Sequence, residues 1–126
     1  MQNGSSQLIA LLNKEDWNSI GFANLGVFYL VAHQGHEYEK IILSIIDSTA
    51  ALDKEGPSSL DEAQLQVDIY AKNMISVKAI GSKVREILDW HKDDLVSCVF
   101  QSEGESFSEL TETKRLTQIY EVDLKI

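Results

Sequence analysis

The sequence predicts an α+β domain that is mainly α, in which three to four packed helices carry a C-terminal antiparallel β-ribbon. Three observations support this fold class. Apolar residues recur at helical spacing over residues 60–90, and the segment before Pro57 is densely apolar. Apolar and polar residues alternate over residues 116–126, as they do in a strand with one buried face.

The chain length bounds the domain organisation. With 126 residues, of which 44% are hydrophobic, the chain can bury one sizeable core but is too short to divide comfortably into two. We therefore expect a single domain over residues 1–126, with a helical part over about 6–92 and a β-ribbon over about 94–126.

The longest predicted helix runs from about Leu60 to Trp90. Its apolar residues follow the 3–4 spacing of a heptad seam, with a second apolar stripe beside it, so the helix is expected to pack against more than one neighbour. Gly81 lies on this seam and indicates a close backbone crossing or a local bend, the alternative being a glycine that is merely tolerated. The seam consists of Leu60, Ala63, Val67, Tyr70, Met74, Val77, Gly81, Val84 and Leu88, and the second stripe of Leu65, Ile69, Ile80 and Ile87.

Two further helices are predicted before Pro57. Residues 16–33 are too densely apolar for one narrow face, which indicates a mostly buried helix, with a strand over residues 27–31 as the alternative. Residues 37–54 indicate a second helix with an isoleucine-rich inner face. Gly56 can end that helix in a left-handed conformation, so the glycine and proline together mark the clearest boundary in the sequence.

The C-terminal third is predicted to form the β-ribbon. Residues 95–100 and 116–126 are its two strands, and residues 101–114 are the long connection between them. A two-stranded ribbon is marginal in water and leaves strand edges unpaired, so it must lie on the helices or recruit strands from another chain. We therefore expect a homodimer that pairs through the C-terminal strand, and Val122→Pro should disrupt it.

Two histidines, three residues apart in the segment "YLVAHQGHEY", form the first candidate site. On a continuous helix His33, His36 and Glu37 would share one face and could hold zinc or iron(II). His91 could add a further ligand if the fold brought it close. Gly35 opposes this interpretation, because a glycine after "VAHQ" is typical of a helix end. A helix junction is therefore our prediction, with a metal site as the alternative, and no cofactor is expected.

The charge of the chain is strongly negative. Its 20 acidic and 11 basic residues give a net charge of −9, which repels phosphates and anionic lipids, so neither nucleic acid nor a membrane is expected as a partner. Residues 93–112 hold six carboxylates and no lysine or arginine. We interpret this segment either as a solvated loop or as a docking surface for a basic partner. The candidate partner-binding residues are Glu103, Glu105, Phe107, Glu109 and Leu110.

No motif in the sequence names a chemistry. It contains no GxSxG, P-loop, GxGxxG or CxxC pattern, and its one cysteine, Cys98, lies in an apolar run, as expected of a buried thiol in a reducing compartment. The leading hypothesis is a non-enzymatic, cytoplasmic protein that acts by binding another protein, as inhibitors, immunity proteins and small chaperones do. The alternatives are a metal-dependent enzyme or metal sensor at the histidine cluster, and a helical structural subunit that assembles with itself.

Overall fold

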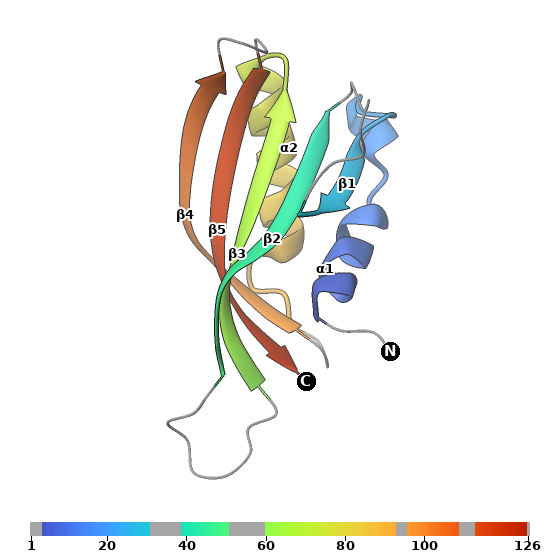
Figure 1. The fold of residues 1–126 in the computed structure, drawn as a ribbon. Coiled ribbons are helices and arrows are strands. Elements are labelled where there is room, and N and C mark those ends of the chain that lie inside the picture. Colours follow the sequence, from blue (N-terminus) through green and yellow to red (C-terminus); the bar gives the residue numbers. More distant parts are fainter. Residues whose placement is uncertain (1–3, 31–38, 51–59, 93–95, 109–112, 126) are drawn as a thin grey trace.

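The computed structural model describes residues 4–30, 39–50, 60–92, 96–108 and 113–125. These residues form two α-helices, one 3₁₀ helix and five strands (Figure 1). In chain order the elements are α1 (Gly4–Asn13), the 3₁₀ helix η1 (Trp17–Ile20), β1 (Gly26–Tyr29), β2 (Lys40–Ala50), β3 (Leu60–Ala71), α2 (Met74–Leu88), β4 (Val96–Ser108) and β5 (Thr113–Lys125).

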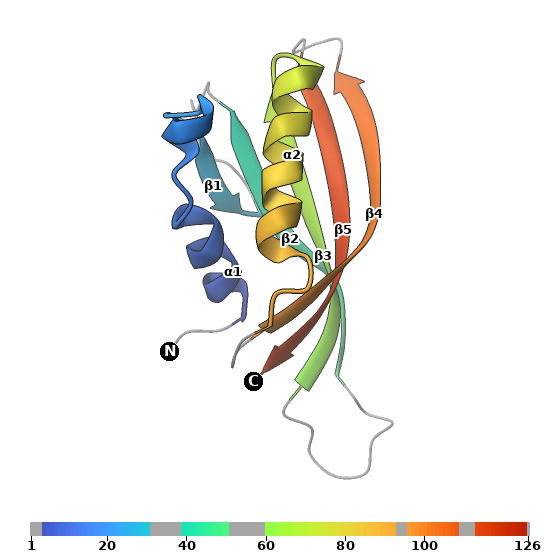
Figure 2. The same cartoon turned by 180° about the vertical axis from the view of Figure 1, so that it is seen from behind.

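The five strands form one mixed sheet in the order β1-β2-β3-β5-β4. β1 runs parallel to β2, and the other neighbouring strands are antiparallel. α2 lies along one face of this sheet, and α1 lies on the same side, against β1 and α2 (Figures 1 and 2). The prediction of a mainly α domain with three to four helices and a two-stranded ribbon is therefore wrong, because the described chain is mainly β. No helix in the described ranges has the length and apolar character that crossing a membrane requires.

The largest correction concerns the helix predicted over residues 60–90, whose first part is strand β3. The seam and the second stripe of the predicted helix include Ala63, Leu65, Val67 and Ile69, which lie at every second residue. These apolar residues therefore fit the period of a strand as well as that of a helix. β3 pairs with β2 on one side and β5 on the other, and this pairing favours the strand. On the face that carries the helices, β3 buries Ala63, Leu65, Val67, Ile69 and Ala71.

Both helices predicted before Pro57 are wrong as well. Residues 37–54 contain strand β2, whose isoleucines are β-branched and favour a strand. Residues 16–33 contain η1, a left-handed turn at Gly21 with φ of 93°, and β1. The alternative strand predicted over residues 27–31 is confirmed for the part that β1 covers. The boundary predicted at Pro57 itself lies outside the described residues.

Helix α2 keeps the second half of the predicted apolar seam. The Asn73 side chain caps its first turn by accepting a hydrogen bond from the Ser76 amide at 2.8 Å. Gly81 is buried, and a Cβ atom at this position would collide with the Leu116 side chain of β5. Gly81 therefore allows a close approach of α2 to the sheet, as predicted, but the atoms that it meets belong to side chains and not to a crossing backbone. The buried residues of α2 are Val77, Ile80, Gly81, Val84 and Leu88.

The predicted pairing of the two C-terminal strands is confirmed, but the strands are longer and a third strand joins them. β4 pairs with β5 from Val96 to Ser108, so the connection predicted over residues 101–114 is mostly strand. β5 lies between β3 and β4, and both of its edges are paired within the chain. The homodimer predicted through the C-terminal strand is therefore wrong in its contact, because β5 has no free edge.

The two faces of the sheet differ in whether helices pack against them. The helices cover one face, and no described element covers the other (Figure 1). Asp68 lies on the uncovered face but is only 8% exposed, because its neighbours enclose it. Its carboxylate accepts hydrogen bonds from the Gln66 amide at 2.8 Å and the Thr117 hydroxyl at 2.7 Å, and the Arg115 guanidinium lies 3.4 Å away. This polar network joins β3 to β5 at the centre of the sheet.

Candidate interaction surface

Of the residues in the predicted metal site, the structure describes His91. This residue follows α2, and its main-chain oxygen accepts a hydrogen bond from the Cys98 amide at 2.8 Å, so it lies where the helix joins β4. His33, His36 and Glu37 lie outside the described residues, and both the metal site and the helix junction stay predictions. Within the described ranges, no group of three or more histidine, cysteine, aspartate or glutamate side chains is placed to hold a metal ion.

The predicted acidic surface lies on the edge strand β4 instead of in a loop. Glu103 and Glu105 are exposed, and both have a partner within the chain. The Glu103 carboxylate accepts a hydrogen bond from the Gln118 amide at 3.0 Å, and the Glu105 carboxylate lies 3.1 Å from the Lys78 ammonium. Sequence patterns missed this strand because glutamate and glycine are depleted in strands, whereas the ladder with β5, which continues to Ser108, holds this segment extended. The other predicted residues are Phe107, whose backbone lies on β4, and Glu109 and Leu110, which lie outside the described residues.

The first half of the outer edge of β4 is closed. In an antiparallel ladder, alternate residues turn their backbone groups away from the partner strand. On β4, Cys98 and Phe100 turn their backbone groups away from β5. The Cys98 amide donates to the His91 main-chain oxygen at 2.8 Å, and the Phe100 amide donates to the Asp89 carboxylate at 2.9 Å. The chain that follows α2 therefore occupies this part of the edge.

The second half of the same edge is open. Phe100, whose amide points outward, lies opposite Tyr120, and the register then shifts by one residue on β4. On β5, the partners of Glu103 and Glu105 lie two and four positions before Tyr120, which is the partner of Phe100. Because every second residue of a ladder faces the same way, the backbone groups of Glu103 and Glu105 point outward, as the Phe100 amide does. No described strand pairs with this side of β4. An unpaired edge of this length offers donors and acceptors to another strand.

Strand β2 has a second open edge. β1 pairs with residues 40–43, and the Leu30 amide donates to the Leu43 main-chain oxygen at 2.8 Å. Beyond Leu43 the strand continues to Ala50, with no described strand on that side. On β3, the partners of Ser48 and Ala50 lie four and six positions before the partner of Leu43. Both separations are even, so Ser48 and Ala50 have the same backbone orientation as Leu43. Their backbone groups therefore face outward, as those of Leu43 do.

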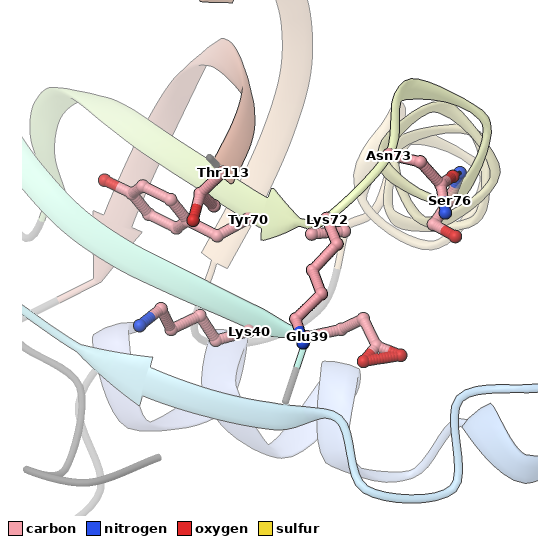
Figure 3. A pocket seen from close by; sticks show the side chains of 8 residues that line it. Glu39, Lys40, Tyr70, Lys72, Asn73, Ser76 and Thr113 are labelled. Carbon is pink, nitrogen blue, oxygen red and sulfur yellow. Dashed lines mark hydrogen bonds between the residues drawn. The ribbon is translucent and has the colours of Figure 1, made fainter. Parts of the chain in front are cut away.

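A pocket of about 390 Å³ lies between the start of β2, the end of β3 and the first turn of α2 (Figure 3). Lys72 reaches across the pocket toward Glu39, and the Lys40 ammonium lies 5.6 Å from the centre of the Tyr70 ring, as in a cation–π contact. The described lining residues include both lysine and glutamate, whose charged groups suit contact with a polar side chain. The lining consists of Glu39, Lys40, Tyr70, Ala71, Lys72, Asn73, Ser76 and Thr113.

A buried polar network joins β5 to α2, and sequence reasoning missed it. Gln118 is fully buried; its amide nitrogen donates to the Gly81 main-chain oxygen at 3.0 Å, and its amide oxygen accepts from the Tyr120 hydroxyl at 2.8 Å. Burial raises the pKa of Tyr120, so the hydroxyl stays protonated and can donate. The signal in the sequence is a polar residue at a buried position of an alternating strand, which predicts an internal partner.

Two exposed apolar side chains sit on left-handed backbone. Leu30 has φ of 70° and is 59% exposed, and Trp90 has φ of 62° and is 78% exposed. The left-handed region favours glycine, and other residues adopt it at a cost. Exposed apolar groups that are held in this way can serve as contacts with a partner.

Replacing Trp90 by glycine is expected to raise the free energy of unfolding by roughly 0.5–1 kcal/mol, because glycine adopts the left-handed conformation at lower cost. Thermal unfolding followed by circular dichroism measures the change. Trp17→Gly is the matched control and should destabilise the protein, because Trp17 is buried and donates to the Leu12 main-chain oxygen at 2.9 Å. A loss of stability in the Trp90 variant would contradict the expectation and indicate that the indole packs on the body.

Comparison with known proteins shows the fold of this chain but no family. No family model matches the sequence, and no curated protein matches it. Among solved structures, the chain is similar to a chain in the structure described as "Virion of native gene transfer agent (GTA) particle". The TM-score is 0.72 at 16% sequence identity, over 94% of this chain and 92% of that chain. At this identity the likeness shows that the two chains share a fold.

Proposed function

We propose that this chain is a structural subunit of a virion-like particle and that it assembles with further copies of itself. The observation that carries the proposal is the likeness in fold to a chain of a gene transfer agent virion, which extends over nearly all of both chains. A likeness of this extent relates whole subunits and not only a shared motif.

Features of the described surface support assembly. The open edges of β4 and β2 offer backbone groups that another strand can satisfy. Leu30, Ile75 and Trp90 are exposed apolar side chains that can add contact area. Open strand edges and exposed apolar side chains are both features through which a chain binds another protein.

The proposal takes up the alternative sequence hypothesis of a structural subunit that assembles with itself, for a chain that is mainly β instead of helical. The sequence alone favours an unrelated partner, which is basic if the acidic segment is the docking surface. A second copy of this chain carries the same net charge of −9. Attraction to a basic partner weakens as salt rises, whereas salt screens the repulsion between like-charged copies. The two partners therefore differ in the sign of their salt dependence.

Sedimentation velocity over a range of protein and salt concentrations tests the proposal. We expect the protein to grow from monomer into larger species as its concentration rises. Growth should begin at a lower protein concentration in about 0.5 M salt than in about 0.05 M salt, because the Debye length falls below the spacing of surface charges. A monomer of unchanged size at every protein concentration and both salt concentrations would contradict the proposal.

A further inference from the structure

The two open strand edges indicate how copies of this chain would join. We propose that the second half of the β4 edge of one copy pairs antiparallel with the β2 edge beyond Leu43 of the next copy, so that the sheet continues from subunit to subunit. This inference rests on the proposed function and specifies the contact through which the subunit assembles.

The two edges match in direction and in length. β2, β3, β5 and β4 are antiparallel in succession, so β4 runs antiparallel to β2 on the far side of the sheet. A copy that is added alongside in the same orientation therefore presents its β2 antiparallel to the first copy's β4. The open stretches, residues 103–108 of β4 and residues 44–50 of β2, are each as long as an ordinary strand.

The open stretches lie at opposite ends of the sheet (Figure 1). On β4 the open stretch is at the end nearest the first turn of α2, whereas on β2 it is at the far end of the strand. A neighbouring copy must therefore shift along the strand direction, as strands do around a staggered barrel. The contact joins two different surfaces, so it builds a ring where the rotation closes and a helical filament where it does not.

Pairing of two β4 edges about a two-fold axis is the competing arrangement. It would bring Glu103 and Glu105 of one copy beside the same residues of the other, and like charges across a strand pair are destabilising. It would also leave the β2 edge of both copies unpaired. Residues 44–50 contain a single carboxylate, so pairing β4 with β2 brings fewer like charges together.

Proline at an outward position of each strand tests the contact. Glu105→Pro removes an amide hydrogen that β5 does not use, so the variant should fold while its β4 edge no longer accepts a strand. Ser48→Pro does the same to the β2 edge. Glu105→Gln and Ser48→Ala are the matched controls, because they change the side chains and keep both amides. Glu103→Pro repeats the test at the next outward amide and guards against a folding defect specific to position 105.

Sedimentation of the variants, alone and mixed, gives the decisive comparison. Each proline variant alone is expected to be a monomer with the circular dichroism spectrum of the parent chain, whereas both controls assemble as the parent does. An equimolar mixture of Glu105→Pro and Ser48→Pro is expected to form a closed one-to-one dimer. The reason is that each variant supplies the one edge that the other lacks.

Several outcomes would overturn this inference while the proposed function stands. They are proline variants that assemble as the parent does, a mixture that stays monomeric, and a Ser48→Pro variant that dimerises while Glu105→Pro does not. The last result would indicate pairing between two β4 edges. A parent chain that never assembles would instead overturn the proposed function and this inference together.

Discussion

Gly81→Ala is expected to lower the free energy of unfolding by about 1–3 kcal/mol, although alanine ordinarily favours a helix over glycine by about 1 kcal/mol. The added Cβ would occupy space that the Leu116 side chain holds, and Leu116 is itself buried in β5. The Gln118 amide nitrogen lies 3.3 Å from the same point and limits movement in that direction. Urea unfolding of the variant and the parent chain measures the loss.

A double-mutant cycle shows whether the crossing at Gly81 is the cause. Leu116→Ala alone should cost about 2–5 kcal/mol, because it leaves a cavity beside the glycine. In that background the cavity accepts the new Cβ, so Gly81→Ala should be neutral or should stabilise by up to about 1 kcal/mol. Losses that simply add would contradict the close contact between α2 and β5.

Gln118→Leu is expected to lower the free energy of unfolding by about 2–3 kcal/mol, because it removes a buried group that is paired on both sides. The Tyr120 hydroxyl loses its acceptor, and the Gly81 main-chain oxygen loses a donor. Leucine fills nearly the same volume, so the loss reflects unmet hydrogen bonds and not an empty space. Thermal and urea unfolding should agree on the change.

Tyr120→Phe provides the control for this network. In the parent chain it removes one hydrogen bond and should cost about 1 kcal/mol. In the Gln118→Leu background it removes a hydroxyl that has already lost its acceptor, so the double variant should be more stable than Gln118→Leu alone. A further loss in the double variant would show that the hydroxyl has found another partner.

The sequence correctly predicts those elements whose apolar residues follow a single period, either that of a helix or that of a strand. The helical spacing of Val77, Val84 and Leu88 recurs in α2, and the alternation from Leu116 onward recurs in β5. Over residues 60–71 the apolar residues fit a helical seam and an alternating strand equally well, so spacing alone could not decide. Pairing with β2 and β5 decided it, and such distant contacts do not follow from a local pattern.

The open edges could not be predicted, because they depend on the order of the strands. Unpaired strand edges recruit other strands. The sequence predicts the free edge on the C-terminal strand, whereas the fold places that strand inside the sheet. Glu103 and Glu105 belong both to the predicted acidic surface and to the open edge of β4. In the present proposal their outward backbone groups make the contact, and their carboxylates do not.

A reconstruction of the assembled parent chain by electron microscopy tests the central claim most directly. It should show subunits in one repeated orientation, with residues 103–108 of β4 in one copy hydrogen-bonded antiparallel to residues 44–50 of β2 in the next. Subunits that touch through their helices or their uncovered sheet faces, with both strand edges free, would contradict the account.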